Sequence, residues 1–174
     1  MGDSAAPSGR PDGRNRRGPA RTDYAGAVYG SLLAASVVAT AGAAGSFPRV
    51  QLVVLLLVTG AVFWAAHVYA QLAGERLVGQ RLSWREIRRV ARHERSIVEA
   101  AVLPAAAVAI SPLLGLDLAG TAWLGLTVAV VQQVGWATLG AVRAGATPRL
   151  AAVEGLGNLV LGLILIAAKA ALGH

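Results

Sequence analysis

The sequence predicts an all-α protein: a polytopic membrane helix bundle of five transmembrane helices, with one further cytoplasmic interfacial amphipathic helix. Five mostly apolar stretches fill nearly the whole chain after Asp23. Each is long enough to cross about 30 Å of hydrocarbon, which takes about 20 apolar residues. Of the 174 residues, 55% are hydrophobic and 14% are charged. A soluble domain of this length could not hide five apolar helices, because it still exposes about a third of its unfolded surface.

The elements follow in chain order. Residues 1–22 combine Gly, Pro, Ser and Arg with almost nothing apolar, so we expect a disordered, basic cytoplasmic tail. The transmembrane bundle takes residues 23–174, with spans predicted at 24–45, 50–73, 97–116, 120–142 and 150–172. A cleaved signal peptide is the rival interpretation of the first span, but its apolar run exceeds the roughly 7 to 15 residues of that class.

The basic residues predict the orientation. All Lys and Arg residues except Arg49 and Lys169 lie in the tail, in the gap 74–96, or at the last bend, which holds Arg143 and Arg149. Because such residues stay on the cytoplasmic side of short loops, we expect the N-terminus inside and the C-terminus outside. Abundant Arg, Ala, Gly and Val suggest a bacterium with a high-G+C genome, and hence the inner (cell) membrane. Topology explains the net charge of +7, so no nucleic-acid partner is implied.

The long gap between the second and third spans contains a helix-start signature. Ser83 and Glu86 have the Ser-x-x-Glu spacing of a capping box, which predicts a helix over about 83–95. Its apolar residues fall on one face and its arginines on the rest. This pattern is typical of a helix in the headgroup layer, bound to anionic lipid headgroups. The lipid-interface residues would be Trp84, Arg85, Arg88, Arg89 and Arg92. A solvated linker helix remains the alternative.

Ionisable and amide side chains inside the membrane are the candidate functional residues, because they usually face the bundle interior. Trp64, His67, Gln71 and Glu75 are spaced 3, 4 and 4 residues apart, which confines them to one helix face, here called the polar seam. A neutral imidazole suits proton relay or cation binding. The other interpretation is that His67 and Gln71 only bond neighbouring helices.

Further polar residues lie at similar depths in the other spans. Glu99 comes just inside the third span, within reach of Arg95, and Glu154 and Asn158 share a face of the fifth. If the helices converge, these groups would line a funnel that opens to the cytoplasm. The cation or proton path candidates are His67, Gln71, Glu75, Glu99, Gln132, Glu154 and Asn158, with Gln133 beside Gln132.

No catalytic residue or cofactor is predicted, and whether a metal binds is unknown. The chain has no HExxH motif and no paired Glu-x-x-His motif, and it has no cysteine. Pro104 and Pro112 free backbone carbonyls that need a partner in lipid, and serve either as a break along a path or as a bend for packing. Gly26, Gly30 and Ala34, spaced four apart, favour a tight bundle or a homo-oligomer.

Several strings resemble a known group of proteins. Val28-Tyr29-Gly30, Phe63-Trp64 with His67 and Tyr69, His93-Glu94 with Ile97-Val98-Glu99, and Asn158 with Lys169 are similar to an uncharacterised family of small bacterial polytopic integral membrane proteins. That similarity covers about residues 24–172 and implies no activity. Trp64 and His67 also resemble the Trp-x-x-His pattern of bacterial relatives of the lysosomal potassium channel, although Val28-Tyr29-Gly30 stands where that family has Phe-Ser-Asp.

Two functions follow from these patterns. The first is a small cation- or proton-conducting channel or transporter-like protein. The second is a structural or accessory membrane protein without transport, in which the polar residues hold helices together and the basic helix contacts a partner or lipid. An enzyme acting on lipid would need an activated nucleophile, and no motif in the sequence supplies one.

Overall fold

The computed structural model describes residues 24–43, 47–74 and 83–172, and these residues are helical apart from short turns. The helices are α1 (Tyr24–Ala43), α2 (Arg49–Gly74), α3 (Trp84–His93), α4 (Arg95–Ile110), the 3₁₀ turn η1 (Ser111–Leu114), α5 (Leu118–Arg143) and α6 (Pro148–Leu172). Five segments are long and apolar enough to cross a membrane: α1, α2, α4 with η1, α5 and α6. For the described residues, the predicted all-α class is confirmed, as are five helices of the length and apolar character predicted for spans. The predicted tail, residues 1–22, lies outside the described residues, as does Glu75.

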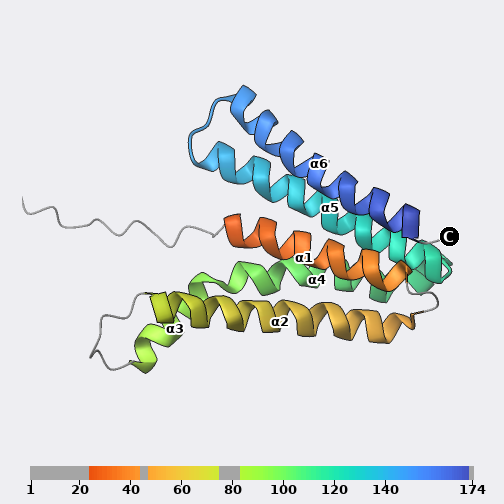
Figure 1. Cartoon of the computed structure of the whole chain (residues 1–174), viewed down its shortest axis with the longest axis horizontal. Helices are drawn as coiled ribbons and strands as arrows, with labels where there is room; N and C mark the ends of the chain where they lie inside the picture. Colours follow the sequence, from red (N-terminus) through yellow and green to blue (C-terminus); the bar gives the residue numbers. More distant parts are fainter. Residues whose placement is uncertain (1–23, 44–46, 75–82, 173–174) are drawn as a thin grey trace, which may run out of the picture.

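Helix α1 occupies the middle of the bundle (Figure 1). It packs most closely against α5 and α4, and it also contacts α6 and α2. Helix α2 packs mainly on α4, and α6 packs mainly on α5, so α2 and α6 lie at opposite edges of the bundle (Figure 1). Residues on α2 are therefore separated from residues on α6 by the central helices.

Small side chains let the central helices approach closely. A Cβ atom added to Gly30 of α1 would lie 2.5 Å from the backbone oxygen of Ile97 in α4, closer than atoms can pack. The main apolar core contains many alanines from α1, α4 and α5. Gly155 of α6 likewise packs against Thr138 of α5. These small residues thus serve packing within one chain, as predicted for a tight bundle, and a homo-oligomer remains a prediction.

Helix α3 begins where the capping signature predicts. Ser83 is its N-cap, but the hydroxyl accepts from the backbone N–H of Arg85, while the N–H of Glu86 bonds to the Ser83 carbonyl. The helix breaks at Glu94 before α4 begins. The two helices are therefore separate elements, joined by a single turn residue.

Most apolar residues of α3 are packed against a neighbouring helix. Ile87, Val90 and Ala91 pack against α2, in a cluster with Trp64, Val68 and Leu72. This packing is available because α2 continues to Gly74 and presents its last turns to α3. Trp84, at the start of α3, is instead 65% exposed, and the predicted lipid-interface arginines Arg85, Arg88, Arg89 and Arg92 are exposed as well.

Candidate functional site

Residues of the polar seam, which lies on α2, contact two different helices. The Trp64 indole donates from Nε1 to the Ala91 carbonyl of α3 at 3.0 Å. The half-buried His67 ring instead packs against Tyr29 of α1, with 5.6 Å between ring centroids, and Gln71 is exposed. Of the seam residues that the structure describes, Trp64 therefore contacts α3 and His67 contacts α1.

Glu99 pairs locally. Its Oε1 atom lies 3.2 Å from Nε of Arg95, one turn earlier on α4, and both side chains are exposed. The predicted pairing with Arg95 is therefore confirmed. An exposed pair of this kind contributes only a few tenths of a kcal/mol to about 1 kcal/mol.

Gln132 connects three helices. Its Nε2 atom donates to the Ser31 hydroxyl of α1 at 3.1 Å and to the Ala100 carbonyl of α4 at 3.0 Å. Pro104 has no N–H, so the Ala100 carbonyl four residues earlier lacks its usual helical donor. Gln132 supplies the partner that this freed carbonyl needs in lipid. Gln132 thus replaces the N–H donor that Pro104 lacks.

Asn158 and Gln133 form a second connection, between α6 and α5. The buried Gln133 donates from Nε2 to Oδ1 of Asn158 at 3.2 Å and to the Asn158 carbonyl at 3.3 Å. Asn158 in turn donates from Nδ2 to the backbone carbonyl of Glu154. The Glu154 side chain is exposed at the edge of the bundle. In the sequence, Gln133 was named only because it lies beside the candidate Gln132. In the structure, it is the residue that bonds to Asn158.

Arg49 makes a third connection, at the end of the bundle opposite α3. Its Nε atom donates to the Thr121 hydroxyl at 3.1 Å, and its Nη2 atom donates to the Leu116 carbonyl. The hydroxyls of Ser111 and Thr121 lie 2.8 Å apart. Sequence reasoning used Arg49 only as an exception in the charge distribution. Its position at the first residue of α2 was the available signal for a helix-end role.

Three buried polar atoms on one turn of α5 have no hydrogen-bond partner in the described part of the chain. They are Oε1 of Gln132, Oε1 of Gln133 and Nε1 of Trp136. Positions 132, 133 and 136 fall within about 100° of the helix circumference at 3.6 residues per turn. The three side chains nevertheless contact different helices: Gln132 bonds to α1 and α4, Gln133 bonds to α6, and the Trp136 ring packs against Tyr24 of α1.

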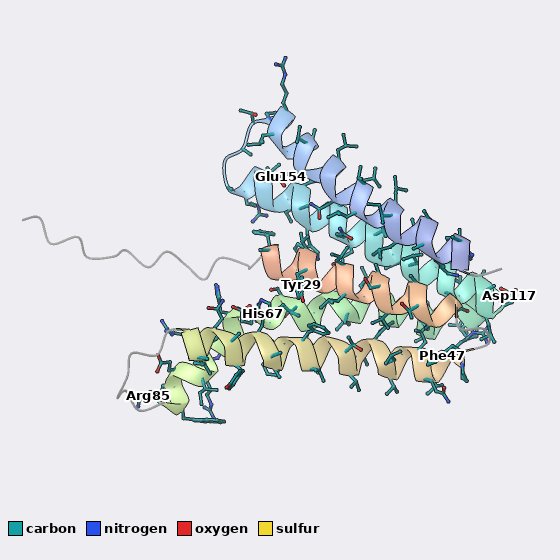
Figure 2. All side chains as sticks on the ribbon, viewed as in Figure 1. Tyr29, Phe47, His67, Arg85, Asp117 and Glu154 are labelled. Carbon is teal, nitrogen blue, oxygen red and sulfur yellow. The ribbon has the colours of Figure 1, made fainter. Side chains whose placement is uncertain are left out.

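The structure does not bring the acidic and imidazole candidates together. Within the described residues, no hydrogen bond, ion pair or ring contact joins His67, Glu99 and Glu154 to one another. Figure 2 shows Tyr29 of α1 between His67 and Glu154. No group of three His, Cys, Asp or Glu residues in the described ranges is arranged to hold a metal ion.

A gap too narrow to hold a water molecule lies between α1, α2 and α4, beside Gly30 and Gly60. Thr59 is the one polar side chain in its lining, and the rest is apolar or glycine. His67, Glu99 and Gln132 are not part of this lining. The gap therefore offers no row of polar groups along which an ion could move.

Comparison with protein-family models, with curated proteins and with solved structures found no match for this chain.

Proposed function

We propose that this chain is a structural or accessory multi-pass membrane protein, without a transport path through its own bundle. The observation that supports this best is that the polar side chains of the membrane region bond to neighbouring helices in separate places. Gln132 binds α1 and α4, and Gln133 binds Asn158 of α6. Interhelical hydrogen bonds in lipid contribute about 0.6 kcal/mol on average, so these contacts hold helices together.

We place the protein in the bacterial inner membrane with α3 on the cytoplasmic side. Arg143 and Arg149 flank the turn between α5 and α6, which lies at the same end of the bundle as α3 (Figure 1). Arg49 and Lys169 lie toward the other end. This distribution is the one that retention of basic residues in the cytoplasm produces.

Helix α3 is the part of this protein that we expect to contact anionic lipid headgroups. Trp84 is exposed, and the Arg88 guanidinium lies 5.5 Å from the centroid of its ring. Arg85 and Arg92 are exposed as well. Because the apolar face of α3 is fixed on α2, its arginines are presented as a surface at the membrane boundary, where each contributes about 1 kcal/mol on anionic lipid.

Flux measurements on proteoliposomes test the proposal. Purified protein is reconstituted with an internal pH-sensitive dye, and proton flux is measured under a potassium diffusion potential. We expect no flux above that of empty liposomes, while His67→Ala lowers the stability of the bundle. A protein-dependent flux that His67→Ala and Glu154→Ala both abolish would contradict the proposal.

A small cation- or proton-conducting protein is the second candidate, and one observation favours it. The unpartnered atoms of Gln132, Gln133 and Trp136 are groups that ordered water usually satisfies when they are buried. Water at this turn of α5 would place a hydrated segment near the centre of the bundle. This candidate requires a protein-dependent cation or proton flux that Gln133→Leu reduces. The control Gln71→Leu, at an exposed position of α2, should leave the flux unchanged.

A further inference from the structure

Lys169 of α6 is a largely buried lysine. Its side chain is 6% exposed, although it lies in the last turn of a membrane-spanning helix. In the part of the chain that the structure describes, it makes no hydrogen bond and no ion pair. Among the described residues, it contacts the Trp123 ring of α5, whose centroid lies 4.6 Å from Nζ.

The side chain is enclosed by three helices. A Cβ atom added to Gly42 of α1 would lie 2.9 Å from Nζ of Lys169 and 3.1 Å from the Ala122 side chain of α5. Lys169 therefore packs against bare backbone one residue before α1 ends at Ala43. The negative end of the α1 dipole favours a cation there. It does not replace a hydrogen-bond acceptor.

An ammonium at this largely apolar position is favoured by an anionic partner, because a charge partly withdrawn from water without one is unfavourable. Asp117 is the one described carboxylate near this end of the bundle. Its Oδ1 atom already accepts from the backbone N–H of Gly120 at 2.7 Å, as the N-cap of α5. A cation–π contact alone contributes about 0.5 to 2 kcal/mol. The described residues thus supply a cation and no anion.

We propose that Lys169 binds the phosphate of an anionic phospholipid at the junction of α1, α5 and α6. A lipid, rather than free phosphate, fits because the position combines the headgroup level with an apolar flank. Trp123 is 39% exposed, as expected for an interfacial indole. Leu161 and Ile164, the preceding turns of α6, are exposed to the acyl layer. This site lies at the end opposite α3 and does not depend on the proposed function.

Fluorescence quenching by brominated lipid tests the site in the full chain. Protein is reconstituted in brominated phosphatidylglycerol or in brominated phosphatidylcholine with the same acyl chains. The Trp123 signal is the part of the emission that Trp123→Phe removes. We expect phosphatidylglycerol to quench this part more strongly, and Lys169→Met to remove the preference. Lys169→Arg should restore it, and Arg149→Met, which removes a cation at the other end, should leave it intact.

Other results would overturn the proposal. Equal quenching by the two lipids in the wild-type protein would show that no anionic lipid is selected at Trp123, and this arm needs no lysine variant to fold. Inorganic phosphate that displaces the preference at equal concentration would identify a free anion as the ligand. A dimer that is lost in Lys169→Met would identify a second copy of this chain as the source of the acceptor.

Discussion

Gln132→Leu tests whether the polar centre of the bundle is held by hydrogen bonds. The substitution removes two donated bonds, one to Ser31 and one to the Ala100 carbonyl. At about 0.6 kcal/mol per interhelical bond, these bonds contribute about 1 kcal/mol. A carbonyl left without a donor adds about 1 to 3 kcal/mol. Removing the unpartnered Oε1 atom offsets part of this, so we expect a net destabilisation of about 1 to 2 kcal/mol.

Pro104→Ala makes the test specific. Alanine at position 104 has an N–H that can donate to the Ala100 carbonyl within α4, so that carbonyl no longer depends on Gln132. A double-mutant cycle isolates this term. We expect Gln132→Leu to be less destabilising by about 1 kcal/mol in the Pro104→Ala background.

The assay is reversible unfolding in mixed micelles, in which the denaturing detergent is titrated and the free energy of unfolding is extrapolated. Gln71→Leu serves as the matched control, because Gln71 is an exposed amide on α2. We expect this control to be neutral. If Gln132→Leu were equally destabilising with and without Pro104, the reasoning that Gln132 satisfies the carbonyl freed by proline would be refuted.

Three further substitutions test other contacts. Gly30→Ala should destabilise the bundle by about 1 to 3 kcal/mol, because the new methyl group meets the backbone of α4; Gly157→Ala, with open space around it, should be neutral or stabilising in the same unfolding assay. Arg49→Met should destabilise the bundle by about 1 to 2 kcal/mol, because it removes charged donors to α5 and to the turn before α5. The control Arg149→Met, at an exposed site, should change stability by less than about 0.5 kcal/mol. Trp64→Phe should speed hydrogen exchange of the α3 amides, because it removes the bond from α2 to α3; unchanged exchange would show that apolar packing alone holds α3.

The features that sequence could predict are those set by local pattern. Apolar length gave the five spans, and the Ser83 signature gave the start of α3. The need of the Pro104 region for a donor was also predictable, because it follows from the missing N–H. Spacing alone likewise gave the pair of Glu99 with Arg95.

What sequence could not predict is which helix stands beside which. Periodicity placed His67 and Gln71 on one face, but the order of helices around α1 decides that Tyr29 covers His67 while Gln71 stays exposed. The funnel hypothesis assumed that α2 and α6 converge, and they lie at opposite edges of the bundle (Figure 1). Gln132 could be singled out as polar, but its donation to Ala100 required the relative position of α4 and α5.

The helix order also sets a condition on any conduction through this chain. A path along the bundle axis would pass where α1, α4 and α5 meet, and at that junction Gly30 brings the α1 backbone onto α4 while Gln132 bonds to both neighbours. Opening it would require α1 to part from α4 and at least one Gln132 bond to break. Conduction and loosening of α1 should therefore rise together, whereas a purely structural protein would lose stability in Gln132→Leu without gaining any flux.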